Sequence, residues 1–314
     1  MKPLRQILVP IDLGKASSDA LERAVALART FDAAITVVHV VDVPSYAYSA
    51  MAFSVADLLT PLEEAAQTQI DAAVAAIRPT LPRIRCVVRR GVAVEEILSA
   101  IGGTKADVVV MGTHGRQGLS HAFLGSVAEK IVRVSPVPVL TVRETDDTAA
   151  GAAPRALRPI HRILAPTDFS GASTYAVDWA IDFAAVLGAS VTIMHAYEYS
   201  LLGLDGGLSS GELDASQRLR EAARDALRQT VESRSGRGVL VTGLLREGIA
   251  WGAIAQLAAS DTETDLIVMG THGRQGVARV LIGSVAEKVV RMSRVPTITV
   301  SLPAPAVAAL RRSA

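Results

Sequence analysis

Two stretches of the chain carry residue types suited to holding an anion. MGTHGRQGLSHAFLGS runs from Met111 to Ser126, and MGTHGRQGVARVLIGS runs from Met269 to Ser284. Each has the pattern of a buried strand end, a glycine-bearing loop and the start of a helix. Glycine lets the backbone approach a ligand closely, and a helix N-terminus offers free N–H groups with a partial positive charge. Each stretch therefore predicts a phosphate-binding loop.

The spacing of the glycines excludes two common nucleotide motifs. A Rossmann fingerprint needs G-x-G-x-x-G after a first strand, and a Walker P-loop needs a lysine directly after its last glycine. Neither copy meets either requirement. Both copies instead contain G-x-x-G, nine further residues, and then G-S.

Alternating strands and helices must position these loops. Apolar, β-branched runs predict strands in the first half over residues 7–10, 34–41, 84–89, 107–111 and 137–142. Helical patterns fall between them, near residues 17–28, 60–78, 92–101 and 126–134, the second opening on an apparent capping box at Thr60. This alternation predicts an α/β fold with a parallel sheet covered on both faces.

In such sheets, ligands bind beyond the carboxyl ends of the strands, where the strand order reverses. Asp12 follows the first predicted strand, and the glycine loop after Met111 follows the fourth. Both therefore lie at the edge of the sheet where a shared pocket is expected.

The second half repeats the first. ILAPTD at 163–168 matches ILVPID at 7–12, and VTIMH at 191–195 matches ITVVH at 35–39. A repeat of this length indicates duplication of a whole domain. We predict a first domain over 1–143, a linker over 144–158, a second domain over 159–302, and a tail over 303–314 that we expect to fray.

Composition narrows the class of protein. A chain of 314 residues suggests about two domains, and a net charge of +1 gives no reason to expect a nucleic-acid partner. The single cysteine, Cys86, suits a reducing compartment. The opening residues lack the apolar segment of a signal peptide, and no apolar run approaches a membrane span of about 20 residues. We expect a cytoplasmic protein with no membrane partner.

The duplicated glycine motif, with these strands around it, resembles the ATP-binding branch of the universal stress protein family. The resemblance covers nearly the whole chain. It implies two tandem, doubly wound domains, each a five-stranded parallel sheet of Rossmann-like type, similar to the adenine nucleotide alpha hydrolases. ATP is the implied ligand, with Mg²⁺ or Mn²⁺ as its cation.

The resemblance assigns roles in the first domain. Asp12, beside Pro10, would contact the ribose or the divalent cation, and the backbone of Val40 would hold the adenine. Gly112 would face the ribose. The residues that would hold the phosphates are Gly115, Gly125, Ser126 and Val127.

The second domain has matching positions throughout. They are Pro166, Asp168, Ala196, Gly270, Gly273, Gly283, Ser284 and Val285. Ala196 replaces Val40; a backbone contact tolerates this change, although one wall of the adenine pocket would be thinner. Asp168 would share the cation role of Asp12.

Several of these residues also fit purely structural roles. Ser126 and Ser284 each begin an S-V-A-E capping box. Asp12 and Asp168 could instead cap the first helix of each half, and Gly112 could simply form a tight turn, as could Gly270.

The remaining histidine, arginine and cysteine residues that could do chemistry are better explained by structural roles or by exposure to solvent. His114, His272, Arg116 and Arg274 lie within the loops, where they could meet phosphate, fix the loop or face solvent. His39 and His195 lie in apolar strands and are expected to be core histidines, because no metal-ligand spacing accompanies them. Cys86 has no base nearby in the sequence, which predicts an inert thiol.

The sequence favours binding over catalysis. ATP hydrolysis needs an oriented water and usually a base, and no residue of the loops is an evident base, so no catalytic residue is assigned. We predict an ATP-binding stress-response regulator. Three alternatives remain: a slow ATPase or adenylyl-transferring enzyme, a nucleotide-free dimerisation scaffold, and a flavin-binding protein.

Partner contacts follow from the sheet edges. The fifth strands are apolar and lie near an edge, which favours pairing; we expect the two halves to form an internal pseudo-dimer and the chain to form a homodimer. The loops at Pro44–Thr60 and Glu198–Gly211 differ most between the halves. Both would lie near the pocket and could act as lids or as surfaces for protein partners.

Overall fold

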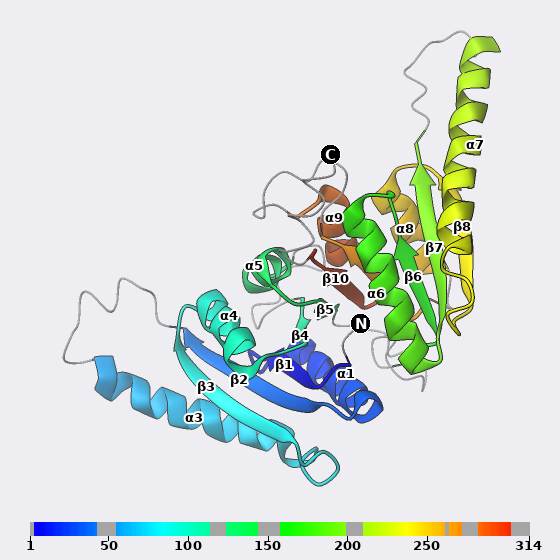
Figure 1. The fold of residues 1–314 in the computed structure, drawn as a ribbon. Helices are drawn as coiled ribbons and strands as arrows, with labels where there is room; N and C mark the ends of the chain where they lie inside the picture. The colour runs from blue at the N-terminus through cyan, green and yellow to red at the C-terminus, as the bar shows by residue number, and fades with distance from the viewer. Residues whose placement is uncertain are drawn as a thin grey trace. The chain divides into compact units, whose positions relative to one another are not determined.

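A computed structural model shows the fold (Figure 1). It describes residues 3–42, 55–113, 124–143, 158–198, 210–260, 264–271 and 282–302. These residues form two compact units, one built mainly from residues up to Arg158 and the other mainly from residues after it. The predicted linker at 144–158, apart from Arg158, and the predicted tail at 303–314 lie outside the described residues.

The first unit alternates strands and helices. Its strands are β1 (Gln6–Pro10), β2 (Ala34–Asp42), β3 (Ile84–Gly91), β4 (Val108–Gly112) and β5 (Val139–Val142). Its helices are α1 (Lys15–Phe31), α3 (Val55–Ala75), α4 (Ala93–Thr104) and α5 (Ser126–Val134). The strand order is β3-β2-β1-β4-β5, and each strand pairs in parallel with its neighbours in this order.

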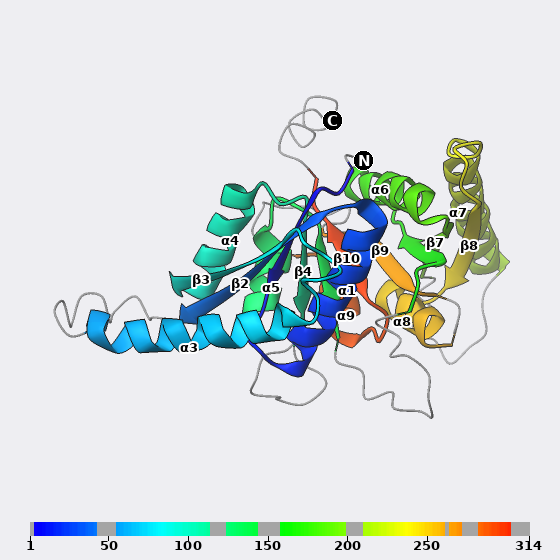
Figure 2. The same cartoon turned by 90° about the horizontal axis from the view of Figure 1, so that it is seen from below.

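The strand order places a switch point at β1. The chain moves outward from β1 to β2 and β3, then returns to β4 on the other side of β1. Because crossovers between parallel strands are right-handed, this reversal moves the later helices to the opposite face of the sheet. Helices α4 and α5 accordingly pack together, away from α1 and α3 (Figure 2).

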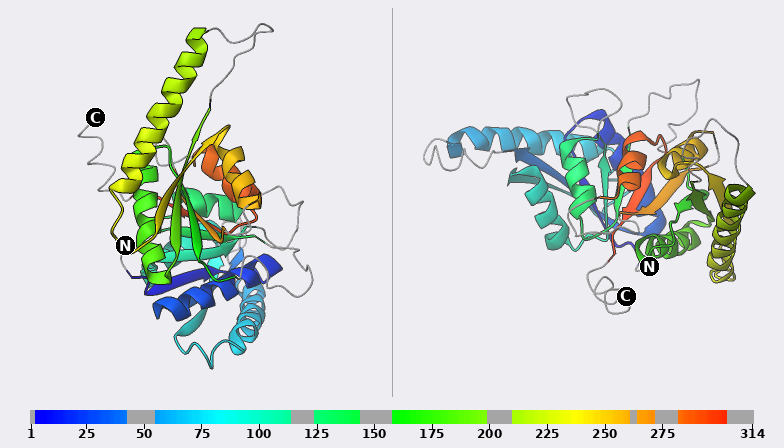
Figure 3. Two further views of the ribbon diagram at one scale, coloured as in Figure 1. Left: turned by 90° about the vertical axis from the view of Figure 1, so that its right-hand side faces the viewer. Right: turned by 90° about the horizontal axis from the view of Figure 1, so that it is seen from above.

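The second unit repeats this plan. Its strands are β6 (Arg162–Pro166), β7 (Ser190–Tyr197), β8 (Val241–Glu247), β9 (Leu266–Gly270) and β10 (Thr297–Val300), in the order β8-β7-β6-β9-β10. Its helices are α6 (Gly171–Leu187), α7 (Ser210–Glu232), α8 (Ala250–Ser260) and α9 (Ser284–Met292). Helices α8 and α9 pack together on one face, whereas α6 and α7 pack on the strands from the other (Figure 3).

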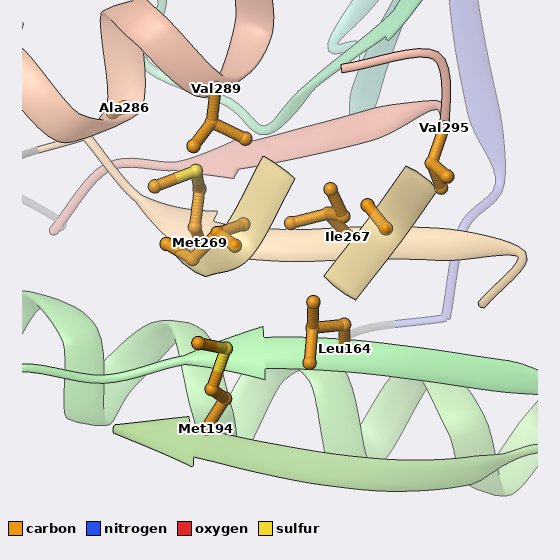
Figure 4. Packing of buried hydrophobic residues seen from close by; sticks show 9 residues of the cluster. Leu164, Met194, Ile267, Met269, Ala286, Val289 and Val295 are labelled. Atoms are coloured by element: carbon orange, nitrogen blue, oxygen red, sulfur yellow. The ribbon is translucent and has the colours of Figure 1, made fainter. Parts of the chain in front are cut away.

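The core of the second unit shows why the strands are continuous apolar runs. Both faces of the sheet are covered, so neighbouring residues along one strand are buried alike. Met269 of β9 packs beneath Val289 of α9, and Ile267 lies beside Leu164 of β6 (Figure 4). Met194 of β7 extends the same cluster. This packing holds β6, β7 and β9 in register, and these are the strands that carry the candidate site.

The start of helix α3 differs from the sequence-based expectation. Helix α3 begins at Val55, so Pro61 lies inside the helix and Thr60 does not start a capping box. Val55, Leu58 and Leu59 have helical spacing, but Pro61 favours a helix start at Thr60, because proline is common at the first helical position. Among the described residues, every helix is too short or too polar to cross a lipid bilayer.

Candidate functional site

The turn after β1 places Asp12 at the carboxyl edge of the first sheet. Strand pairing extends one residue past Pro10, because the Ile11 N–H donates to the Val38 carbonyl at 2.8 Å. Asp12 Oδ1 then accepts from the Gly14 N–H at 3.0 Å. Gly14, rather than Asp12, is the N-cap of α1. Asp12 therefore orders the turn instead of capping the helix itself, and its side chain stays partly exposed.

His39 ties the end of β2 to this turn. Its Nδ1 lies 2.8 Å from the Ile11 carbonyl oxygen, directly before Asp12. The bond gives His39 a structural role and brings Val40, the next residue, beside the Asp12 turn. Within the described ranges, no three His, Cys, Asp or Glu side chains form a metal-binding group.

Gly112 ends β4 against the first turn of α1. A Cβ atom at this position would lie 2.8 Å from the carbonyl carbon of Ala16 and 2.9 Å from its Cβ. Such contacts are too short for any other residue, so glycine is required by helix–strand packing. The tight-turn interpretation is therefore not the reason for this glycine, and the packing brings the Asp12 turn next to the end of β4.

The glycine loop is closed at its base. The Gly125 N–H donates to the Thr113 carbonyl at 2.7 Å, and the Thr113 N–H donates to the Val142 carbonyl at 3.0 Å. Gly115, His114 and Arg116 lie outside the described residues. The base alone thus fixes where α5 begins relative to β4 and β5.

The predicted capping box at Ser126 is wrong. Gly125 is the N-cap of α5, with φ −60° and ψ 142°, and it makes no side-chain cap bond. Ser126 is the first helical residue and is exposed, with Val127 behind it. The first N–H groups of a helix lack partners within the helix. The N-terminus of α5 can therefore offer these groups to an anion.

The second unit reproduces each contact. Asp168 Oδ1 accepts from the Ser170 N–H at 3.1 Å, and His195 Nδ1 lies 2.7 Å from the Thr167 carbonyl oxygen, beside Ala196. A Cβ on Gly270 would lie 3.0 Å from the Ala172 carbonyl oxygen.

The second loop base and helix start also match the first. The Gly283 N–H donates to the Thr271 carbonyl at 2.7 Å. Gly283 is the N-cap of α9, without a side-chain cap bond, so Ser284 and Val285 take the places of Ser126 and Val127 and the second capping box is wrong as well. Gly273, His272 and Arg274 fall outside the described part of the chain.

Charged residues on the outer strands differ between the halves. Arg90, near the end of β3, makes a bidentate ion pair with Glu63 of α3, at 2.6 and 2.8 Å. The hydrogen bond from Arg90 lowers the pKa of Glu63. The equivalent position in β8 is Glu247, which accepts from the Tyr197 hydroxyl at 3.1 Å. Burial, followed by this bond to Glu247, raises the pKa of Tyr197. Sequence reasoning missed both pairs, because neither has a local spacing signal.

The arrangement at each edge fits a polyanion that carries hydroxyl groups and a cation. The uncapped helix N-terminus suits phosphate, and a carboxylate can accept from ribose hydroxyls or hold a cation. Mg²⁺ bound to a nucleotide usually takes one or two protein carboxylates and completes its shell with phosphates and water. Asp12 and Asp168 each supply one carboxylate, which fits this mode and not a dedicated metal cage.

Comparisons with known proteins identify the family. The profile of the universal stress protein family matches residues 3–143 and again 159–301. A universal stress protein of Methanocaldococcus jannaschii is 34% identical over 143 residues, which cover 45% of this chain and 82% of that protein. One from Mycolicibacterium smegmatis is 25% identical over 299 residues, 94% of this chain and 96% of its own length.

A solved structure shares the fold across both halves. The crystal structure of a universal stress protein from Archaeoglobus fulgidus covers 94% of this chain and 98% of its own, with a TM-score of 0.60 at 21% identity. The double match of the family profile spans most of the sequence. The chain belongs to the universal stress protein family, as a tandem member with two copies of the domain.

Proposed function

We propose that this protein binds ATP in both halves and acts as a nucleotide-dependent regulator of the stress response, with little or no turnover. The observation that carries the proposal is the pair of helix starts at Gly125 and Gly283. Each is an N-cap without a side-chain bond. The Gly125 N–H donates to the Thr113 carbonyl and the Gly283 N–H to the Thr271 carbonyl, which holds each helix start at the carboxyl edge of its sheet. Both helices therefore begin with N–H groups available to phosphate.

The other contacts follow from the geometry of the edge. Asp12 and Asp168 would hold the ribose or the Mg²⁺ or Mn²⁺ that accompanies ATP. The backbone at Val40 and Ala196 would hold the adenine, since each directly follows the histidine bound to the Asp turn. Pro10, Gly112, Pro166 and Gly270 would line the edge, and the phosphates would lie against Gly115, Gly125 to Val127, Gly273 and Gly283 to Val285.

The test is direct measurement of bound nucleotide. Protein purified at near-physiological salt is denatured and its nucleotide identified by mass spectrometry, and ATP affinity is measured by titration calorimetry with Mg²⁺ present. We expect adenine nucleotide in the preparation and binding that is lost in Asp12→Ala combined with Asp168→Ala. Nucleotide-free protein with no affinity for ATP would overturn the proposal.

Two further measurements separate the other functions. Single-turnover assays with labelled ATP detect a hydrolase or an adenylyl-transferring enzyme; turnover abolished by the same double substitution would favour the enzyme. A yellow protein would indicate flavin.

We also propose that the chain forms a homodimer in the cytoplasm, with its halves as an internal pseudo-dimer. The single cysteine supports a reducing compartment. Sedimentation analysis tests the dimer, and a monomer at micromolar concentration would contradict it. Protein partners are tested by affinity capture with and without ATP.

A further inference from the structure

Strand β8 pairs on one side only within the described part of the chain. It stands at the end of the strand order and pairs in parallel with β7. Gly243, in the middle of β8, is exposed although it has no side chain. A Cβ added to it would lie 3.1 Å from the Val231 side chain of α7, so α7 covers this face of the strand. The exposure of Gly243 therefore belongs to its backbone, along the open edge of β8.

The ladder with β7 shows which backbone groups of β8 point outward. The Val191 N–H donates to the Leu240 carbonyl at 2.9 Å, and the Gly248 N–H donates to the Tyr197 carbonyl at 2.9 Å. Alternate residues of a strand direct their N–H and C=O groups to the same side, so the even-numbered residues from Leu240 to Gly248 face β7. The N–H and C=O groups that point away from β7 belong to Val241, Gly243, Leu245 and Glu247.

A row of outward N–H and C=O groups is a template for a further strand. Two copies of β8 that run antiparallel about a two-fold axis at Leu244 match all of these groups at once. Val241 then exchanges hydrogen bonds with Glu247 of the second copy, and Gly243 does so with Leu245 of the second copy. Because the contact is isologous, the axis repeats both pairs, and every outward group of β8 gains a partner.

The side chains of β8 suit this register. Leu244 lies opposite its own equivalent, and Thr242 lies opposite Arg246 of the second copy. Charged residues thus meet only uncharged ones across the pair. Leu240 and Ile249, which are 70% and 53% exposed, flank β8 at its two ends. Antiparallel pairing brings the Leu240 end of one copy to the Ile249 end of the other, which shields apolar surface at each end from water.

The equivalent strand of the first half opposes such pairing. The Ile35 N–H donates to the Arg83 carbonyl at 2.9 Å, so by the same alternation the outward residues of β3 run from Ile84 in steps of two. Antiparallel pairing of two β3 strands in the matching register would set Arg85 opposite Arg89 of the second copy. Like charges directly opposite each other destabilise a strand pair. Thr242 stands in β8 where β3 has Arg85, so β8 lacks this repulsion.

We infer that β8 is the homodimer interface: a second copy of the chain pairs with it in antiparallel orientation, centred on Leu244. This rests on the homodimer proposed above and names the surface that forms it.

The first test is disulfide cross-linking of the full chain in a Cys86→Ala background. In the inferred register, the two Cα atoms of residue 244 are about 4.5 Å apart, as in any non-hydrogen-bonded antiparallel pair, and a disulfide spans this distance. Leu244→Cys should therefore give covalent dimers under mild oxidation. Leu240→Cys is the control. Leu240 is more exposed than Leu244, but its two copies would lie roughly 27 Å apart, so this variant should stay monomeric on a non-reducing gel.

The second test changes the charge at residue 242. Thr242→Arg imitates the repulsion of β3 and should weaken the dimer, whereas Thr242→Glu faces Arg246 of the second copy and should strengthen it. Each dimer contains this pair twice, so the two dissociation constants should change about ten-fold in opposite directions. Both variants lose the same hydrogen bond to Thr192, so the charge distinguishes them. Analytical ultracentrifugation measures the constants, and adding Arg246→Glu to Thr242→Arg should restore the dimer.

Two results would overturn the β8 interface alone. One is a dimer in which Leu244→Cys cross-links no better than Leu240→Cys. The other is a pair of dissociation constants that move in the same direction for Thr242→Arg and Thr242→Glu. A monomeric unaltered protein would overturn the homodimer together with this interface. Nucleotide binding is measured separately by titration, so a failure of the proposed ATP binding is distinguishable from both.

Discussion

Gly112 and Ala16 are in backbone contact, so that a single added methyl group at Gly112 would lie 2.8 Å from the Ala16 carbonyl carbon. The end of β4 and the first turn of α1 therefore meet without intervening side chains. This contact sets the distance between two segments that both border the candidate site.

Gly112→Ala should lower the free energy of unfolding by about 1–3 kcal/mol, because the new methyl forces the strand and helix apart. Gly270→Ala should act in the same direction but less strongly, since its nearest contact is 3.0 Å. Urea unfolding followed by circular dichroism measures both. Gly102→Ala is the control: this residue lies in α4 with nothing within 4 Å of an added Cβ, so the substitution should stabilise by up to about 1 kcal/mol. Equal effects at Gly102 and Gly112 would contradict the packing argument.

Ser126→Ala should change the free energy of unfolding by less than about 0.5 kcal/mol, because Ser126 is an exposed first residue and Gly125 is the cap. Ser170→Ala, at a cap with a side-chain bond, should cost about 1 kcal/mol. Thermal unfolding of the two variants provides the comparison. A cost at Ser126 that equals the cost at Ser170 would show that Ser126 does cap its helix.

Glu63→Gln should reveal a pH-dependent contribution from the pair with Arg90. The pKa of Glu63 is lowered from its ordinary value of 4.5 by the Arg90 hydrogen bond. The unfolded chain therefore takes up a proton first as pH falls, so the stabilisation is complete above about pH 5 and is lost as pH drops through the lowered folded pKa. Because Arg90 and Glu63 side chains remain 33% and 29% exposed, the contribution at neutral pH is at most about 1 kcal/mol.

The free energy of unfolding is measured between pH 3 and 7 for the unaltered protein and for Glu63→Gln. The difference between the two free energies at each pH gives the contribution of the pair. Asp225→Asn is the control, since its pair with Arg228 is mostly exposed. A gap that widens on acidification would refute the assigned sign.

Cys86 should react slowly with thiol reagents in the folded protein. Burial is the main cause that raises the pKa of its thiol, and Asp71 adds to it while Arg78 opposes it. The reactive thiolate is therefore scarcer at neutral pH than in an unfolded chain. As the single cysteine, it gives one labelling rate, which we expect to be slower than the rate in denaturant at neutral pH. Arg78→Ala should slow it further, and labelling as fast as in denaturant would contradict the assignment.

The sequence alone was sufficient for the fold because its signals are periodic. Continuous apolar runs such as VVVM at 108–111 and the helix starting at Ser126 were located closely. Because the domain is duplicated, each strand and helix could be predicted twice, once from each half of the sequence. The predicted start of α3 was wrong, because proline usually stands at the first position of a helix, whereas Pro61 lies inside this one.

The sequence predicted where the residues of the candidate site lie in the fold better than it predicted what each of them does physically. Asp12 and Gly112 were expected at one edge of the sheet, and the hydrogen bond of His39 and the contact with Ala16 bring their segments together. That Gly112 serves helix packing depends on the distance between two elements, which no local pattern encodes. The hydrogen bonds that join Ser170 to Asp168 and to Ser173 were not predicted either, because these groups meet only once the turn is folded.

The bond from Gly125 to Thr113 has a consequence for protein engineering. It anchors both ends of the segment between these residues to the sheet, at the junction of β4, β5 and α5. A peptide inserted or exchanged between the anchors would leave and re-enter the scaffold at unchanged points. The same anchors recur at Thr271 and Gly283. The chain thus has two equivalent segments that can be replaced. One can carry a new sequence, while the unchanged other segment serves as a control within the same protein.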